Sequence, residues 1–186
     1  MRSPVTIQTS FDLQPILKGD LLELRPLTPE DFDDLYAVAS DPLVWEQHPD
    51  KDRYKKDVFK KFVDEALESG GALVAIDAKN GRLIGSSRYH CYDLDRSEIE
   101  IGWTFLARSY WGGKYNGQMK LLMLMHAFRF VGNVIFVVNE YNLRSQRAVE
   151  KIGGVRVGSK TDPGGRKSFI YRITRSTFQN QTRTVT

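Results

Sequence analysis

A glycine-containing stretch near the middle of the chain has the composition of an anion-binding loop. Residues 110–117 read YWGGKYNG, with Gly112 and Gly113 adjacent and Gly117 four positions further on. Glycine costs stability in regular structure, but it lets a ligand come close to the backbone. Before a helix, unpaired N–H groups and the positive end of the helix dipole favour an anion such as a pyrophosphate. A plain structural turn is the alternative interpretation.

The hydrophobic pattern predicts a strand before these glycines and a helix after them. Residues 96–106 alternate strictly, as strand residues do, and we expect a helix at about 114–131. The glycines therefore stand where a helix-terminal anion site would be. The expected strand carries Glu98, Glu100, Gly102 and Thr104 on one face, and Ile99, Ile101, Trp103 and Phe105 on the other.

The remaining pattern predicts an α/β fold with a mixed central sheet of about seven strands and helices on both faces. The Asn-Gly pair at 80–81 indicates a hairpin, and the apolar run 134–138 suits a buried central strand. A helix is expected to begin at the capping residue Asn142. We divide the chain into an N-terminal arm (1–18), one domain (19–176) and a loose C-terminal tail (177–186).

Composition narrows the class of protein. The 186 residues carry a net charge of +4, contain one cysteine and hold no apolar run of membrane-spanning length. A disulfide framework is therefore excluded, and no secretory signal is visible, so we expect a cytoplasmic protein. The basic residues are spread out rather than clustered with aromatics, which argues against nucleic-acid binding. No His, Asp or Glu cluster has metal-ligand spacing, so we expect no metal and no membrane association.

Two segments together resemble a known family. EIGWTFLARSYWGGKY and, about 25 residues later, NLRSQRAVEKIGG resemble the two halves of the acyl-CoA site in the GNAT (Gcn5-related N-acetyltransferase) superfamily. A Trp-Gly pair before one helix and N-x-x-S opening the next resemble its RimJ/RimL ribosomal-protein branch. The resemblance covers about residues 20–176. It implies that the strands 98–106 and 134–138 splay apart and hold a pantetheine arm between them.

The resemblance also implies acetyl-CoA as co-substrate and a set of binding residues. Lys114 departs from the pattern, because the family usually has Gly or Ala at that position, which leaves the geometry of the loop open. The implied residues are Trp103, Thr104 and Phe105 along the pantetheine, Arg108, Trp111, Gly112, Gly113, Lys114, Tyr115 and Asn116 around the pyrophosphate, and Asn142 and Ser145 near the thiol.

Acetyl transfer to an amine needs a proton acceptor, an oxyanion donor and a proton for the leaving thiolate. Glu100 and Glu98 are the candidate acceptors, and two solvated carboxylates are the alternative. A backbone N–H within 103–105 is the expected oxyanion donor. Many family members use a Tyr as the acid where this chain has Val149, so we expect Ser145 to take that role. A serine in a first helical turn could instead satisfy local backbone groups.

The amine acceptor is expected to bind near a loop at 44–49 and a strand at 88–90. It could be a protein α-amine, as the RimJ/RimL resemblance suggests, or a small-molecule amine. A non-catalytic acyl-CoA-binding or interaction module is the alternative function, and a monomer or a homodimer the expected assembly. The candidate acceptor residues are Trp45, His48, Arg88, Tyr89 and His90.

Overall fold

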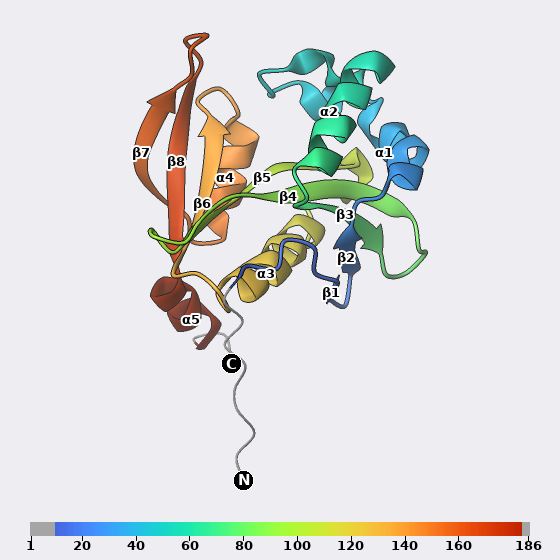
Figure 1. Cartoon of the computed structure of the whole chain (residues 1–186). Coiled ribbons are helices and arrows are strands. Elements are labelled where there is room, and N and C mark those ends of the chain that lie inside the picture. Colours follow the sequence, from blue (N-terminus) through green and yellow to red (C-terminus); the bar gives the residue numbers. More distant parts are fainter. Residues whose placement is uncertain (1–9, 184–186) are drawn as a thin grey trace.

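One open sheet of eight strands runs through the computed structural model, which describes residues 10–183 (Figure 1). The strand order is β1-β2-β3-β4-β5-β6-β8-β7, and neighbours are antiparallel except β5 and β6, which are parallel. The strands are β1 (Leu17–Lys18), β2 (Leu22–Pro26), β3 (Ala72–Asp77), β4 (Leu83–Asp93), β5 (Glu98–Leu106), β6 (Asn133–Asn139), β7 (Val155–Thr161) and β8 (Lys167–Thr174).

Helices cover both faces of this sheet, which confirms the predicted fold class. No helix between residues 10 and 183 combines the length and apolar character that crossing a membrane requires. The α-helices are α1 (Phe32–Ala39), α2 (Lys56–Glu68), α3 (Tyr115–Ala127), α4 (Leu143–Lys151) and α5 (Arg175–Arg183), and the 3-10 turns are η1 (Pro29–Asp31), η2 (Pro42–Trp45), η3 (Lys51–Tyr54) and η4 (Arg108–Tyr110).

Local sequence signals explain where the first helices begin and end. The first helical segment after β2 starts as η1, where the Thr28 amide donates to the Asp31 carboxylate at 2.8 Å. Asp31 also pairs with Arg25 of β2 at 2.6 Å, which ties the helix start to the sheet. α2 ends at Glu68, two residues before Gly70, whose φ of 63° lies in the left-handed region that favours glycine.

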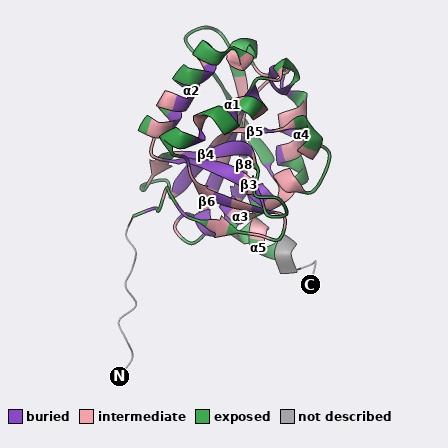
Figure 2. Cartoon of the chain, turned by 90° about the vertical axis from the view of Figure 1, so that its right-hand side faces the viewer, coloured by how far each residue is buried: buried purple, intermediate pink, exposed green. Residues whose placement is uncertain are grey.

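The core has two parts, one on each face of the sheet. Met119 and Met123 of α3 pack beneath β4 and β5, with Tyr89 among their buried neighbours. Phe59 and Phe62 of α2 pack above the same strands, together with α1. Figure 2 shows the strands as the buried centre, with exposed surface on the outer sides of α1 and α2. The two layers hold β4 and β5 rigidly between them.

The N-terminal segment is attached to the fold where the structure describes it. Of the predicted arm, residues 1–9 lie outside the described residues. Phe11 is buried, with its ring centroid 5.1 Å from that of Tyr89 and 5.1 Å from that of Phe130. The carbonyl of Asp12 lies 2.8 Å from Nε2 of His126 on α3. This segment therefore covers one side of α3.

The C-terminal segment is helical, contrary to the expectation of a loose tail after residue 176. α5 follows β8 directly, and its Phe178 ring packs on Phe128 at a centroid distance of 5.1 Å. Hydroxyls at its start provide the cap, because the amide of Thr177 donates to Oγ1 of Thr174 at 3.2 Å. The contact of Phe178 with Phe128 and the capped first turn explain why a helix forms here, although the polar sequence does not predict one.

Strand β7 forms one outer margin of the sheet. Every residue of it is exposed, and the register against β8 shifts between Arg156 and Gly158. The strand therefore carries a bulge and is not covered by any other element of the described chain.

Candidate active site

The sheet opens between its two parallel strands. β5 and β6 pair only from Glu98–Asn133 to Glu100–Ile135. Beyond this point β5 continues to Leu106 and β6 to Asn139, and β5 stays paired with β4 alone. One edge of β5 is therefore open, as the predicted splay requires. In Figure 1, β6, β8 and β7 form a wing set apart from β1–β5.

A bulge in β5 lies where the two strands diverge. Arg88 of β4 pairs with Gly102, whereas Ser86, two residues earlier, pairs with Phe105. β5 therefore has one extra residue in this interval. Trp103 adopts a φ of 49°, a left-handed conformation that a bulky residue rarely takes without tertiary support.

The bulge corrects the predicted side-chain alternation of this strand. The ring of Trp103 lies 4.9 Å from that of His90, on the α2 side of the sheet with the two glutamates, and Phe105 packs with α2 as well. Thr104 points the other way and bonds the ammonium of Lys120 on α3. Strict alternation had placed Thr104 with the glutamates and the two aromatics opposite. A one-residue insertion inverts the faces after Gly102.

The glycine stretch forms an exposed loop whose amides are free. Gly112 has a φ of 69°, and a Cβ at Gly113 would meet no atom within 4 Å. Lys114 is already helical, with φ −84° and ψ −14°, so its place in the loop causes no strain. The first backbone bond into the helix runs from the amide of Gln118 to the carbonyl of Lys114, at 2.9 Å. Among the described residues, the amides from Gly112 to Gly117 have no acceptor.

Side chains on either side hold this loop in place. The indole N–H of Trp111 donates to the carbonyl of Leu106 at 2.9 Å. The hydroxyls of Tyr110 and Tyr115 donate to the carboxylate of Asp77 on β3, at 2.8 and 3.3 Å. The loop is therefore presented by a fixed frame, which lowers the entropy cost of binding an anion.

Arg108 and Asn116 complete the predicted loop residues. The Arg108 guanidinium forms an ion pair with Asp41, the residue that caps η2, and it thereby lowers the pKa of that carboxyl. Its charge is therefore partly engaged outside the loop. Asn116 lies in the first turn of α3 and is half-buried.

The start of α4 brings two further predicted residues to the divergence point. The buried side chain of Asn142 caps the helix, accepting from the amide of Ser145 at 3.2 Å. The Ser145 hydroxyl itself forms no hydrogen bond within the described part of the chain. Val149, one turn on, is packed into the core. Asn142 therefore performs the local capping that was the alternative role for Ser145.

Arg144 links the two halves of the site and was not predicted. Its guanidinium stacks on the Trp111 ring at 3.9 Å from the centroid and donates to the carbonyl of Val44 at 3.0 Å. Its backbone amide donates to Oε1 of Gln47, also at 3.0 Å. The start of α4 is thus joined to the glycine loop and to the segment after η2. A single arginine in a helix's first turn gives no sequence signal for such a bridge.

The two candidate proton acceptors differ in their surroundings. Glu98 pairs with Arg172 of β8 at 3.2 Å. Glu100 is also buried, but no described residue donates a hydrogen bond to it. Burial raises the pKa of Glu100; Lys160 partly opposes this and Glu98 adds to it. Glu100 is therefore the carboxylate with free acceptor atoms and increased basicity.

The candidate acceptor residues fall in three places. Trp45 belongs to the core, with its indole N–H bonded to the carbonyl of Ala39 at 2.7 Å. His48 is half-buried next to Arg53, and loss of solvation lowers the pKa of His48 to about 4. Tyr89 points to the α3 side, where its hydroxyl donates to the carbonyl of Met123 at 2.7 Å. His90, half-buried beside Trp103, shares the face of the glutamates with Arg88, whose guanidinium also lies against Trp103.

A buried lysine lies beneath the open part of β5 and was not predicted. The Lys120 ammonium donates to the Ser87 hydroxyl at 3.1 Å and to that of Thr104, and it lies 5.6 Å from the centre of the Phe136 ring on β6. Burial lowers the pKa of Lys120 to about 7. Helical spacing from Met123 and Leu124 is the sequence signal that would have placed this lysine on the buried face. No group of three or more potential metal ligands gathers in the described chain.

The sequence matches one protein-family model over most of its length. A family model described as an Acetyltransferase (GNAT) domain matches residues 22–155. A search of curated proteins found no match.

Many solved structures share the fold, among them these three. A GCN5-related N-acetyltransferase from Brucella melitensis is 19% identical, with a TM-score of 0.79 over 89% of this chain and 81% of that one. A GNAT-family acetyltransferase from Bacillus anthracis is 22% identical, with a TM-score of 0.74 over 87% and 99%. A spermidine N-acetyltransferase from Vibrio cholerae, in complex with CoA and spermine, is 15% identical, with a TM-score of 0.68 over 87% and 100%.

Proposed function

The chain belongs to the GNAT acetyltransferase family, and from this premise we propose that it transfers the acetyl group of acetyl-CoA to a primary amine by direct attack. The observation that carries the proposal is the run of free amides at 112–117 beside the open edge of β5. The amides suit a pyrophosphate at a helix start, and the open edge suits an extended chain that bonds as a strand does.

Acetyl-CoA fits the residues around the divergence point. The Vibrio cholerae spermidine N-acetyltransferase of this fold was solved with CoA. In this chain we assign the amides of 112–117 to the pyrophosphate and the backbone of 103–105 to the pantetheine arm. The side-chain nitrogen of Asn142 has no acceptor among the described residues, and we assign it to the arm near the thiol. Arg108 and Lys114 add positive charge at the rim of the loop.

Glu100 is the proposed proton acceptor. The amine nitrogen attacks the thioester carbonyl carbon, a C–N bond forms, and the nitrogen must lose a proton, which Glu100 takes through a water. The raised pKa of Glu100 makes it a stronger base than an ordinary carboxylate. Glu98 is engaged by Arg172, so we give it a supporting electrostatic role. A backbone N–H within 103–105 would stabilise the oxyanion.

Ser145 is the proposed proton donor to the leaving group. When the C–S bond breaks, the sulfur departs with the electron pair as a thiolate, and the Ser145 hydroxyl supplies a proton to it and regains one from water. The hydroxyl is available because Asn142 caps the helix through its own side chain and leaves Oγ of Ser145 unbonded. The exposed Tyr141 is a weaker substitute.

The identity of the amine acceptor, the cellular location and the oligomeric state are also proposals. A protein α-amine, which the RimJ/RimL resemblance suggests, and a small-molecule amine are both compatible with the family. We retain the expected cytoplasmic location and a monomer or homodimer.

A thiol-release assay tests the function. Purified protein is mixed with acetyl-CoA and a panel of amino acids, peptides and polyamines, and acetylated product is identified by mass spectrometry. We expect thiol release that requires one of the amines. Acetyl-CoA binding without amine-dependent release would support the alternative, a non-catalytic acyl-CoA-binding module.

A further inference from the structure

Arg88 is a buried guanidinium without a counter-ion. The residue lies on β4 with 4% of its surface exposed. Its Nε and Nη2 atoms are fully buried and have no hydrogen-bond partner within the described chain. Burial lowers the pKa of Arg88 to about 10, while Glu65 of α2 raises it without coming within ion-pair distance. A buried charge left unpaired is costly, so this arginine is expected to have a partner that is not part of the chain.

Two aromatic rings lie next to this guanidinium. Trp103 and Phe62 have ring centroids 4.8 and 5.5 Å from its central carbon. Nε and Nη2 share one edge, and this is the pair that grips a carboxylate through two parallel hydrogen bonds. The two atoms without partners are therefore the two that carboxylate binding would use.

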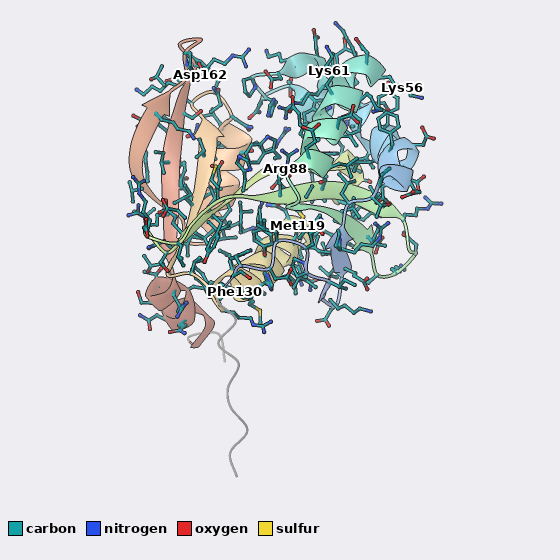
Figure 3. The ribbon with its side chains drawn as sticks, viewed as in Figure 1. Lys56, Lys61, Arg88, Met119, Phe130 and Asp162 are labelled. Atoms are coloured by element: carbon teal, nitrogen blue, oxygen red, sulfur yellow. The ribbon has the colours of Figure 1, made fainter. Side chains whose placement is uncertain are left out.

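A glycine on β5 leaves room between the Arg88 guanidinium and the Glu100 carboxylate. Gly102 lies directly across from Arg88 in the β4–β5 ladder, and a Cβ at Gly102 would meet only Oε1 of Glu100, at 3.4 Å. Glu100 is the diagonal neighbour, about 7 Å away in a ladder of this kind. Figure 3 shows Arg88 above the sheet, between α2 and α4, whereas Met119 lies on the other side.

Because Nε and Nη2 are fully buried, a carboxylate reaches them only if a neighbouring side chain moves. Trp103 is the half-buried neighbour, and its indole N–H forms no hydrogen bond among residues 10–183 that would hold the ring in place. The next cation, Arg53, is already paired with Asp50 at 2.8 Å. Arg88 is therefore the guanidinium of this region with free donors.

We infer that the acceptor is a small amino acid whose carboxylate binds Arg88 while its amine faces Glu100. The inference rests on the proposed function, because it names the class of amine that the same site would acetylate. The short separation across the ladder favours an amine and a carboxylate within one small molecule. Polyamines, which carry no carboxylate, would not satisfy Arg88.

Matched acceptor pairs test this assignment. β-Alanine and β-alaninamide differ in the carboxylate, and glycyl-aspartate and glycyl-asparagine differ in an acidic side chain of a peptide. We expect kcat/KM to be about tenfold or more higher for β-alanine than for its amide, as for a buried charged hydrogen bond. A preference confined to glycyl-aspartate would move the carboxylate to a peptide side chain and overturn the small-amino-acid assignment.

Substitutions then attribute the preference to Arg88. Arg88→Met should remove the difference between acid and amide, and Arg88→Lys should retain part of it. Arg88→Met should melt no lower than the parent, since it removes an unpaired buried charge. Arg96→Met, at an exposed arginine in the β4–β5 turn, is the matched control and should change nothing. Equal rates for acid and amide, or a preference that survives Arg88→Met, would refute the inference.

The inference and the function can fail separately. Acetylation of spermidine or of the amides alone would leave the function intact and refute the carboxylate site. If no amine is acetylated, the proposed function is wrong, and a binding measurement then tests the carboxylate site at Arg88. N-acetyl-β-alanine with CoA should then raise the melting temperature of the parent but not of Arg88→Met. An equal shift, or none, would count against a carboxylate site.

Discussion

Asn142 and Ser145 divide two tasks at the start of α4. The Asn142 side chain caps the helix, and the Ser145 hydroxyl is left without a bond. Replacing Ser145 with Ala should therefore change the free energy of unfolding by only about 0.5 kcal/mol. If the hydroxyl protonates the thiolate, kcat should fall by about 10² or more while acetyl-CoA affinity is kept.

Asn142→Ala is the comparison for that test. It removes the cap, which should cost about 1 kcal/mol of stability, and it should also weaken acetyl-CoA binding, because its side-chain nitrogen is assigned to the pantetheine arm. Single-turnover kinetics, measured where chemistry limits the rate, would separate the two effects. A kcat of Ser145→Ala within about threefold of the parent value would show that Ser145 is not the acid.

Glu100 should give both activity and stability a pH dependence. Its folded pKa is raised by burial, so activity should increase with pH as the carboxylate ionises, and Glu100→Gln should lose this limb of the kcat/KM profile. The folded state binds the proton more tightly than the unfolded state. Its contribution to stability is therefore present at low pH and is lost as pH rises through the raised pKa.

Denaturant unfolding of Glu100→Gln and the parent across pH measures the second effect. The variant should gain stability relative to the parent as pH rises above the ordinary glutamate range. Glu98→Gln, at the residue paired with Arg172, is the comparison. Parallel stability curves for Glu100→Gln and the parent would mean that Glu100 is solvated, which was the alternative interpretation from the sequence.

At the scale of elements, the glycine loop can be tested without disturbing the fold. A side chain at Gly113 meets no neighbour, whereas Gly112 has a positive φ that strains any other residue by about 1–2 kcal/mol. Gly113→Val should therefore weaken acetyl-CoA binding by about tenfold or more with little loss of stability. Calorimetric titration on a folded Gly113→Val protein checks this, and unchanged affinity would make the stretch a simple turn.

The buried lysine of α3 should make stability depend on pH in the opposite sense to Glu100. The pKa of Lys120 is lowered to about 7, so the stability linked to its neutral form is present at high pH and is lost as pH falls from about 10 to about 7. Lys120→Met should be more stable than the parent at pH 7, by about 1–4 kcal/mol. The Ser87 and Thr104 hydroxyls lie 2.8 Å apart and can bond each other in the variant.

Chemical denaturation at several pH values between 7 and 10 measures this advantage. It should shrink as pH rises, because the free-energy cost of keeping the folded lysine neutral falls as pH approaches the ordinary lysine pKa of 10.5. An advantage that stays constant over this range, or a loss of stability, would show that Lys120 is charged and well solvated.

The order of the elements was predictable from sequence, but part of the site was not. Capping residues and the change from helical to alternating periodicity fixed where helices and strands lie. The bulge at Trp103 depends on how β4 and β5 align, and no local pattern contains that information. For the same reason the lack of a partner for Arg88 could not be foreseen, since it depends on what surrounds the residue from α2 and β5.

At the scale of the molecule, acetyl-CoA should join the two parts of the sheet. A ligand that binds only the folded state raises stability by about 2.7 kcal/mol at a hundredfold excess over Kd, or roughly 5–10 °C in a protein of this size. Differential scanning fluorimetry would measure the shift. A truncated thioester lacking the pyrophosphate should give a smaller one, and no shift with millimolar acetyl-CoA would contradict the proposed function.

The splay between β5 and β6 also bears on how the protein avoids aggregation. An unpaired strand edge usually invites other chains to add to it. The open edge of β5 lies in the interior of the sheet, between β4 and the β6–β8–β7 wing, and not at a margin where a second polypeptide would add a strand. At the true margins, β1 has only two residues, and β7 carries basic side chains and a bulge. The edge of β5 can therefore bind an extended ligand in the interior of the sheet, without forming a margin to which another copy of the chain could add a strand.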